Sequence, residues 1–392
     1  MNLLEGIFRD WFSFGMDQTH RPVQTCGFAI TSLVLGILGL CMVPLGVVAV
    51  IFGHLSLSRI KKSSGLTGGY GIATAGLITG YIGTLMAVAF GVILGFSIIS
   101  EQKEAEKAEE PFSFEAAVIP SFSEPGELRE VGEKGVRFYD LSTKGQGVGE
   151  SMQFRVYLPP GEASPKSLRC VLVPPAGSNL LSGLSLDGGD YHDETLPYAE
   201  AGMVVINYSI DGVVEDDEDT DDIKKGYEAF RRAGAGVING RNAMELAKQT
   251  LPQVDPDKIF SAGHSSAGSL SLLIASHLPE LAGAVAYAPI SDLESDYGDL
   301  VNDFSMKLQY PGLPAFVVRS SPMTHAREVE VPVFLFFAKD DERVSLEDGR
   351  SFGRLVQDQG GDSEVATVSE GGHYNSMITD GIPRGIAWML KH

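Results

Sequence analysis

The stretch Lys258-Ile-Phe-Ser-Ala-Gly-His-Ser-Ser-Ala-Gly268 decides the fold of this chain. An apolar run leads into a Gly-x-Ser turn and a helix-forming run follows it, so the pattern predicts a strand, a sharp turn and a helix. Two other segments lie far downstream, Phe336-Phe-Ala-Lys-Asp-Asp-Glu-Arg-Val344 and Gly371-Gly-His-Tyr374. A serine, an aspartate and a histidine therefore follow three predicted strands in that order.

Ser265 is the predicted nucleophile of this constellation. A serine hydroxyl is a poor nucleophile at neutral pH, so it needs a base within reach and a carboxylate that orients the base. The strained turn that exposes such a serine requires small residues two positions before and after it, here Gly263 and Ala267. Ser266 fits less well because the bulky His264 would precede it. The alternative is a serine that only caps the following helix.

The surrounding sequence predicts an α/β fold with a doubly wound, mostly parallel sheet. Short, continuous apolar runs suit parallel strands that are buried on both faces. Helical patterns over residues 222–250, 266–277 and 346–358 alternate with them, while residues 291–330 break the rhythm and suit a small lid. The apolar runs are Cys170–Val173, Met203–Tyr208, Ile259–Ala262, Ala284–Tyr287 and Val333–Phe337.

With these motifs the chain resembles the α/β-hydrolase superfamily, and within it the dienelactone-hydrolase and prolyl-oligopeptidase-like groups, over residues 135–392. The lead-in Val254-Asp-Pro-Asp-Lys-Ile-Phe-Ser-Ala-Gly-His-Ser-Ser is a familiar form in those groups. The resemblance implies that Asp341 is the catalytic acid, although the His and Gly of the family's His-Gly-x-x-Asp-x-x-Val turn are replaced here. Asp340 is the fallback. His373 matches the catalytic base, in a loop that two glycines allow to bend.

A tetrahedral oxyanion requires preorganised N–H donors. The amide of Ser266, at the start of the helix, is the first predicted donor. The second is expected in Pro174-Pro-Ala-Gly-Ser-Asn179, from Ala176 or Gly177, where the family often has His-Gly-Gly. Two residues after a neighbouring strand are candidates for the substrate pocket, Tyr208 and Asp211, and Tyr208 suits the core equally well.

The N-terminal quarter has the composition of a membrane segment. Residues 27–53 and 65–100 carry no charged side chain, and each exceeds the roughly 20 apolar residues that cross a bilayer as a helix. Two such runs side by side predict a transmembrane hairpin rather than a buried core helix or a signal peptide. Together with the connector His54–Gly65, residues 27–98 resemble a widespread bacterial two-helix membrane domain of unknown function.

Charge and glycine spacing add two expectations for this hairpin. Arg59, Lys61 and Lys62 in the short connector favour a cytoplasmic connector, which would place both chain ends outside the cytoplasm. The pairs Gly76/Gly80 and Gly91/Gly95 have the GxxxG spacing that lets helices approach closely. We expect packing within the hairpin first and a homo-oligomer contact second.

Composition excludes several classes of function. The net charge of −21 argues against a nucleic-acid partner, because phosphate binding requires a basic face. Three cysteines build neither a disulfide framework nor a zinc site. The acidic run Glu215–Asp222 matches no EF-hand spacing and suits an acidic loop before a helix. We therefore assign no metal and no cofactor.

The sequence thus predicts four segments and one chemistry. The segments are an N-terminal lead over 1–26, the hairpin over 27–99, a charged stalk and linker over 100–130, and the hydrolase domain over 131–392. The chemistry is cleavage of a small carboxylic ester or a short peptide by a serine hydrolase tethered to a lipid bilayer. An ester is favoured because no propeller-sized region restricts peptides by size. The alternative from another class is a non-catalytic hydrolase fold that serves as a membrane-tethered scaffold.

Overall fold

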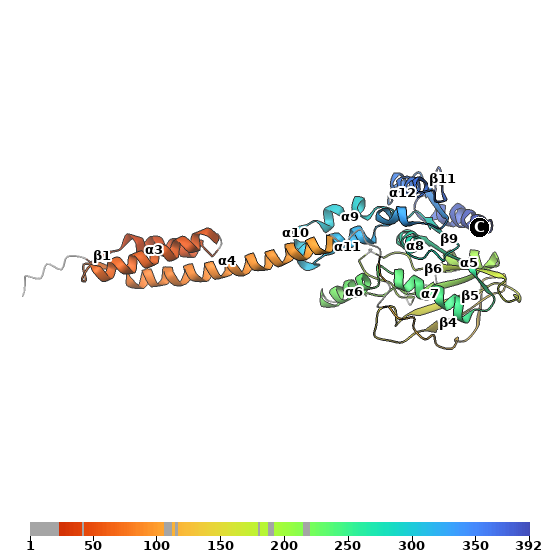
Figure 1. Ribbon diagram of the computed structural model, residues 1–392, viewed down its shortest axis with the longest axis horizontal. Coiled ribbons are helices and arrows are strands. Elements are labelled where there is room, and N and C mark those ends of the chain that lie inside the picture. The colour runs from red at the N-terminus through yellow and green to blue at the C-terminus, as the bar shows by residue number, and fades with distance from the viewer. Residues whose placement is uncertain are drawn as a thin grey trace, which may run out of the picture. The chain divides into compact units, whose positions relative to one another are not determined.

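A computed structural model describes residues 23–40, 43–105, 112–113, 117–178, 181–186, 192–214 and 220–392 of the chain. These residues form two compact units, Met1–Ile99 and Ser100–His392 (Figure 1). Most of the predicted N-terminal lead, residues 1–22, lies outside the described residues, as do residues 106–111 of the predicted stalk and residues 215–219 of the acidic run.

The N-terminal unit is built from three helices. They are α2 (Gly27–Leu38), α3 (Val43–Lys62) and α4 (Tyr70–Ala105). The first predicted span is not one helix, because it is divided between α2 and α3, which pack against each other. Among the described residues, Tyr70–Phe96 is the one helical stretch that is long and apolar enough to cross a membrane. One such helix and two shorter neighbours are therefore found among the described residues, and the second span stays a prediction.

Glycines allow the three helices to approach closely, as the first GxxxG pair predicted. A Cβ at Gly80 would lie 3.0 Å from the carbonyl oxygen of Gly46 in α3, and a Cβ at Gly76 would collide with Ser32 in α2. The Ser32 hydroxyl also donates to the carbonyl of Ala49 at 2.8 Å. The second pair differs, since a Cβ at Gly91 or Gly95 meets no described atom within 4 Å.

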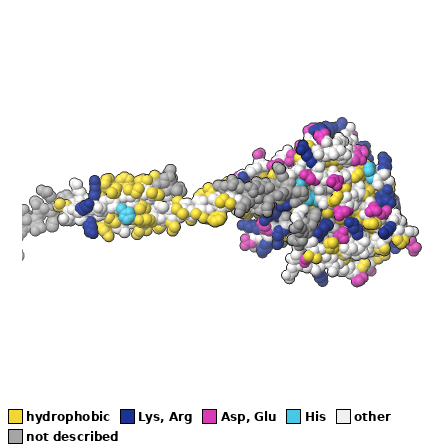
Figure 2. Space-filling view, in the orientation of Figure 1, with side chains coloured by type: hydrophobic (Ala, Val, Ile, Leu, Met, Phe, Trp, Pro, Cys, Tyr) yellow, Lys and Arg dark blue, Asp and Glu magenta, His cyan; other side chains and the backbone are white. Residues whose placement is uncertain are grey.

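The outer surface of this unit is apolar. Hydrophobic side chains run along it in Figure 2, and lysines and arginines gather at one end. Leu85 and Phe96 of α4 are each 71% exposed, whereas Arg59, Lys61 and Lys62 occupy the last turn of α3. Contiguous apolar surface of this kind marks a region that contacts lipid or another protein.

The C-terminal unit contains the predicted sheet. Nine strands lie in the order β11-β10-β9-β8-β6-β7-β5-β4-β3, and the six from β6 to β11 are parallel while β3 to β5 are antiparallel. The strands are β3 (Arg129–Val131), β4 (Val136–Ser142), β5 (Gln153–Leu158), β6 (Leu168–Val173), β7 (Val204–Tyr208), β8 (Val254–His264), β9 (Gly283–Tyr287), β10 (Val333–Ala338) and β11 (Ser363–Val368).

Helices cover both faces of this sheet, so its central strands are buried on two sides. One core holds the strands together with α7 (Val237–Thr250), α8 (Ser266–His277) and α12 (Leu346–Asp358). The opposite core includes α5 (His192–Glu200) and α13 (Ile382–Met389). The continuous apolar runs of the sequence are explained by this burial, and the expected α/β fold class is confirmed.

The segment expected as a lid is helical. It contains α9 (Leu293–Val301), α10 (Phe304–Gln309), α11 (Leu313–Ser320) and the 3₁₀ segment η1 (Pro322–Glu328). The helix expected over 222–250 is divided into α6 (Thr220–Arg232) and α7, because Gly234 and Gly236 take positive φ angles between them.

Phe112, which lies within the predicted stalk and linker, is fixed to the far end of α8. Its backbone N–H donates to His277 Nε2 at 2.9 Å, and the two rings lie 5.5 Å apart. The Arg319 guanidinium carbon lies 4.7 Å from the centroid of the Phe112 ring. Gly234 leaves room for this ring, since a Cβ there would approach it to 2.9 Å. The chain thus attaches to the helix whose other end carries Ser265.

This attachment predicts a pH dependence of stability. Burial lowers the pKa of His277 to about 4, and nearby His325 and Arg319 act in the same direction. Since the unfolded chain binds the proton near pH 6.5 and the folded chain does not, stability is full above that pH and is lost as pH falls towards 4. His277→Gln, which keeps an acceptor for Phe112, should flatten part of this slope in urea unfolding of the detergent-solubilised chain.

A matched variant separates the proton from the hydrogen bond. His277→Leu removes the acceptor as well, so we expect it to lower the free energy of unfolding at every pH. His264 and His325, whose pKa values are also lowered by burial, keep part of the slope in both variants. A slope in His277→Gln equal to that of the wild type would contradict the prediction.

Candidate active site

Ser265 occupies a strained turn between β8 and α8. Its backbone has φ 54° and ψ −122°, a conformation that L-residues other than glycine rarely adopt. The Ser265 amide donates to the carbonyl of Tyr287 at the end of β9 (2.9 Å), and its carbonyl accepts from the amide of Ser269 in α8 (3.0 Å). Both neighbouring elements thus hold the turn in place.

Small residues make this turn sterically allowed. A Cβ at Gly263 would collide with the backbone of Ala267, so the strand and helix approach closely only because Gly263 has no side chain. A Cβ at Gly268 would lie 3.0 Å from the carbonyl of Gly263 and 3.3 Å from that of Tyr287. Gly263 and Gly268 therefore provide the room that this turn requires, and the buried Ala267 occupies a position where the motif usually has glycine.

His373 and Asp341 form a buried pair. Nδ1 of His373 lies 2.8 Å from Oδ2 of Asp341, and the two side chains are 12% and 1% exposed. A carboxylate only accepts hydrogen bonds, so Nδ1 carries the hydrogen and Nε2 is left as the basic nitrogen. The second oxygen of Asp341 accepts from the amide of Arg343 at 2.8 Å, which fixes the carboxylate.

Asp340, the fallback acid, has a different task. Its carboxylate accepts from the amides of Gly371 and Gly372 at 3.0 and 2.9 Å, and these hydrogen bonds lower its pKa. Both glycines take positive φ angles, 121° and 61°. The two adjacent aspartates therefore have different roles, since Asp340 holds the loop that carries His373 and Asp341 contacts the imidazole.

His264 connects the serine turn to the histidine loop. Its Nε2 lies 2.9 Å from the carbonyl oxygen of His373, and the two rings are 4.6 Å apart. A carbonyl accepts, so Nε2 donates. Burial, followed by the neighbouring His373, lowers the pKa of His264 to about 4, which keeps it neutral at pH 7. This contact places the histidine loop beside the residue that precedes Ser265.

The remaining contact of a triad is open in this structure. Within the described residues, Ser265 Oγ makes no hydrogen bond to His373. Such contacts are often loose before substrate binds and tighten in the complex. Ser265, His373 and Asp341 are thus brought to one edge of the sheet, with one of the two expected side-chain contacts formed.

The predicted oxyanion residues lie together, but not as a simple pair of amides. The amides of Gly177 and Ser178 both donate to Ser266 Oγ, at 3.0 and 3.1 Å. The Gly177 N–H is therefore engaged by a protein hydroxyl. In the described part of the chain, the amides of Ala176 and Ser266 have no hydrogen-bond acceptor.

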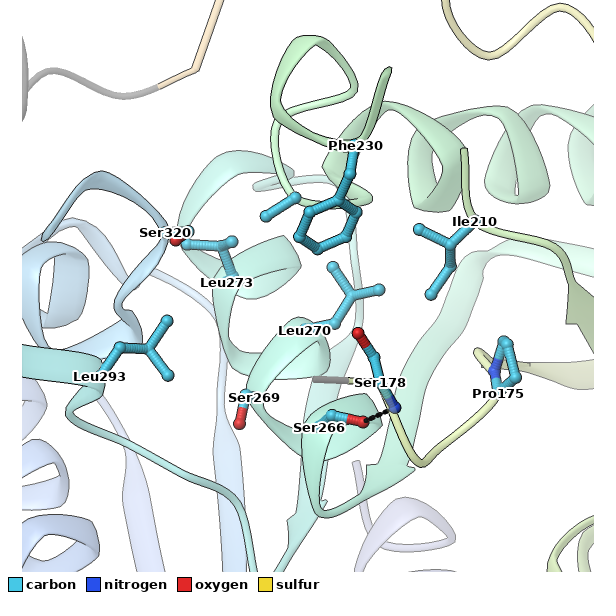
Figure 3. A pocket seen from close by; sticks show the side chains of 11 residues that line it. Pro175, Ser178, Ile210, Phe230, Ser266, Ser269, Leu270, Leu273, Leu293 and Ser320 are labelled. Carbon is cyan, nitrogen blue, oxygen red and sulfur yellow. Dashed lines mark hydrogen bonds between the residues drawn. The ribbon is translucent and has the colours of Figure 1, made fainter. Parts of the chain in front are cut away.

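A pocket adjoins this loop (Figure 3). It is narrow and partly open to solvent, and Ser178 and Ser266 lie at one end. Residues of α8 form one wall and residues of α6, of the loop after β7 and of the lid form the others. Its apolar lining consists of Pro175, Ile210, Phe230, Ala235, Leu270, Leu273 and Leu293.

The two residues considered for the substrate pocket lie elsewhere. Tyr208 is fully buried in β7 as part of the core, and burial raises the pKa of its hydroxyl. The Asp211 carboxylate accepts from the amide of Gly149 at 2.7 Å and from the side chain of Asn239 at 2.9 Å. Ile210, between them, is the residue of this loop that lines the pocket.

Two side-chain contacts of this region were not predicted from the sequence. His264 was considered only as a bulky neighbour of a serine, and Ser266 only as a less suitable nucleophile and as the source of a backbone amide. The His264 contact joins a side chain to a backbone carbonyl 109 residues away, and the Ser266 contacts join its hydroxyl to amides 88 and 89 residues away. No local pattern indicates contacts of this kind.

Comparisons with known families divide the chain in two. The model of a domain of unknown function, DUF4190, matches residues 28–97. The model of the prolyl oligopeptidase family matches residues 238–392, the part that carries Ser265, Asp341 and His373. No curated protein matches the chain.

Solved structures resemble the larger unit. An acetyl xylan esterase from Paenibacillus sp. R4 is 14% identical with a TM-score of 0.51, and the match covers 75% of this chain and 94% of that one. Acetyl xylan esterase 1 from Thermoanaerobacterium sp. JW/SL YS485 is 16% identical with a TM-score of 0.50, over 74% and 93%. Identities this low show a shared fold.

The family match and the fold agree with each other. The prolyl oligopeptidase family is part of the α/β-hydrolase superfamily. The parallel sheet and the serine turn after β8 are features of the same superfamily. The chain is a serine hydrolase with an α/β-hydrolase domain, which follows a DUF4190 segment.

Proposed function

We propose that this serine hydrolase is anchored in a membrane and cleaves a carboxylic ester through Ser265, His373 and Asp341. The supporting observation is the His373–Asp341 pair, joined at 2.8 Å and nearly buried, beside a serine in a strained turn. An imidazole whose Nδ1 is held by a carboxylate presents a basic Nε2. That is the group a serine hydroxyl requires for attack.

The proposed reaction has two steps. Nε2 of His373 takes the proton of Ser265 as Oγ forms a bond to the acyl carbon, and the proton then passes to the leaving alkoxide as the ester C–O bond breaks. The acyl group is left on Ser265. In the second step, His373 takes a proton from water and the hydroxide attacks the acyl-enzyme. The proton then passes from His373 to Ser265 Oγ as the bond between Oγ and the acyl carbon breaks, and the carboxylic acid is released.

The tetrahedral intermediate of each step carries a negative oxygen. In our proposal the Ser266 amide at the N-terminus of α8 is one donor to this oxygen, and the Ala176 amide is the other. Ala176 takes precedence over Gly177, the other sequence candidate, because the Gly177 amide already donates to Ser266 Oγ. Ala176 precedes Gly177 and Ser266 follows Ser265, and hydrogen bonds fix both of these neighbours. The two donors therefore require little reorganisation when the oxyanion forms.

The pocket supports an uncharged acyl group. Among the described residues that line it none carries a charge, and Leu270, Leu273 and Leu293 provide apolar contact. The same pocket would accept an apolar side chain of a short peptide. The match to the prolyl oligopeptidase family favours that second substrate class, and a panel of p-nitrophenyl esters and aminoacyl p-nitroanilides compares the two directly.

Substitution of the proposed triad gives the first test of this function. A fluorophosphonate probe should label the wild-type chain, and Ser265→Ala should abolish labelling because the probe bonds to the activated oxygen. Asp341→Asn should lower ester turnover by roughly 10³- to 10⁴-fold, since the amide favours the wrong tautomer of His373. Asp340→Asn is the matched control, and we expect a smaller loss because that side chain contacts loop amides only.

Controls make this test decisive. His373→Ala should also lose labelling, whereas Ser266→Ala should still be labelled, though more slowly. Circular dichroism of each variant reports whether the domain is folded. A folded wild-type chain that neither reacts with the probe nor cleaves any ester or peptide would contradict the proposal.

The pocket predicts acyl-chain selectivity. Leu273→Ala should enlarge the pocket and raise kcat/KM for p-nitrophenyl hexanoate relative to the acetate. Leu272→Ala is the control, because Leu272 is equally buried in α8 but does not line the pocket. Both variants should lose about 2–5 kcal/mol of unfolding free energy. The same selectivity in both variants would mean that the acyl group binds elsewhere.

The proposed anchor is α4. Its stretch Tyr70–Phe96 has 27 residues, which at about 1.5 Å per residue exceeds the roughly 30 Å of a bilayer core. Arg59, Lys61 and Lys62 precede it, and the positive-inside rule places them in the cytoplasm. The hydrolase domain, on the other side of α4, would then lie outside the cytoplasm. The exposed apolar surface of α2 and α3 would contact the same bilayer.

Membrane fractionation tests this arrangement. The chain should remain with membranes after an alkaline wash, and protease added to spheroplasts should digest the hydrolase domain. Replacing Arg59, Lys61 and Lys62 with glutamines should increase the fraction that is protected, because the orienting charge is removed. Complete protection of the wild-type domain in intact spheroplasts would place it in the cytoplasm instead.

A further inference from the structure

The hydroxyl of Ser266 occupies an unusual place beside the nucleophile. Ser266 is 5% exposed, at the first position of α8, and its Oγ receives the backbone amides of Gly177 and Ser178 at 3.0 and 3.1 Å. Figure 3 shows the Ser266–Ser178 contact at the end of the pocket. Two amides that converge on one oxygen form the kind of donor pair that stabilises negative charge on oxygen.

This arrangement leaves the Ser266 hydrogen available. A hydroxyl has two acceptor lone pairs and one O–H donor, and both lone pairs of Ser266 Oγ face an amide. In the described part of the chain, no group accepts the O–H. A serine inside a helix often donates to the carbonyl four residues earlier, but that carbonyl belongs here to Ala262, within β8. The helix therefore supplies no acceptor for this hydrogen.

We propose that Ser266 is a catalytic residue that donates its O–H to the oxyanion formed on attack by Ser265. The inference rests on the proposed function of Ser265 and deepens it. The Gly177 and Ser178 amides withdraw electron density from Ser266 Oγ, which makes its O–H a stronger donor than an isolated hydroxyl. These two amides thus act on the intermediate through Ser266 rather than directly. The proton stays on Ser266, so no bond is formed or broken there.

This role also accounts for the weak oxyanion motif of the chain. The loop Pro174-Pro-Ala-Gly-Ser lacks the His-Gly-Gly of many relatives, and Pro175 has no N–H to contribute. The O–H of Ser266 supplies a donor that the loop cannot. The Ser266 amide and the Ala176 amide complete the set, so three donors would face the developing charge.

A purely mechanical role is the competing explanation, in which Ser266 only holds the loop. Ser266→Ala removes both the O–H and the loop contact, whereas Ser266→Thr keeps both. Ser178→Ala is the matched control for loop mobility, because the Ser178 hydroxyl donates to the carbonyl of Ser182 at 2.6 Å and its removal leaves the Ser266 hydroxyl intact. Steady-state kinetics of the full chain in detergent, with p-nitrophenyl acetate, compare the three variants.

The expected result is a loss in kcat without a matching change in KM. Ser266→Ala should lower kcat by roughly 10²- to 10³-fold, the usual cost of removing one oxyanion donor, while KM changes less than about threefold. Ser266→Thr should recover most of the rate, and Ser178→Ala should lose less than about tenfold. Slower fluorophosphonate labelling of Ser266→Ala, with the site still reactive, should accompany this pattern.

Other outcomes overturn the proposal. A Ser266→Ala variant with kcat within a few fold of the wild type, or one whose loss equals that of Ser178→Ala, assigns Ser266 to the loop alone. A loss that appears in KM does the same. These results are distinguishable from failure of the proposed function, because in that case the wild-type chain itself would show neither labelling nor turnover.

Discussion

The strained backbone of Ser265 is the constraint on which the rest of the site depends. A residue at φ 54° and ψ −122° costs on the order of 1–3 kcal/mol, so neighbouring contacts must hold it. Hydrogen bonds to Tyr287 and Ser269 do so, and the absence of a side chain at Gly263 lets β8 and α8 meet at this angle. The turn lifts the hydroxyl clear of the sheet, where the other loops reach it.

Those loops converge because of the sheet topology. The residues of the site follow the carboxyl ends of β6, β8, β10 and β11, which are parallel strands of one sheet and therefore end at the same edge. The turn after β10 supplies Asp341, the loop after β11 supplies His373, and the loop after β6 supplies the amides that contact Ser266. Contacts between loops, such as that of His264 with the carbonyl of His373, then set the fine geometry.

Sequence reasoning predicted the parts of this molecule that have a local pattern. The apolar runs located β6 to β10, and the Gly-x-Ser turn located the strained serine, because both depend on neighbours in sequence. It named no apolar run for β3, β4 or β11, although it placed a strand before His373, because these strands carry little continuous apolar sequence. It also took residues 27–53 as one helix, since apolar composition alone does not show where a helix ends.

The candidate site was predictable to a similar degree. The order of serine, aspartate and histidine was visible in the sequence. The different contacts of Asp340 and Asp341 were not, because they depend on where a loop 31 to 32 residues away folds back. The choice between Ala176 and Gly177 likewise depends on the Ser266 side chain, which comes from another element. Contacts between loops that are distant in sequence can be identified only from the three-dimensional structure.

The attachment of Phe112 to α8 has a mechanical consequence. α8 has 12 residues, so it extends for about 18 Å from Ser266 to His277, and a hydrogen-bonded helix resists stretching along its axis. A tether that joined a surface loop would dissipate tension there. Here Phe112 is hydrogen-bonded to His277, at the end of α8 away from Ser265. Force applied to the chain at Phe112 would therefore be transmitted along α8 towards Ser265, so under the proposed membrane anchoring a pull on the anchor would act on the geometry of the candidate site.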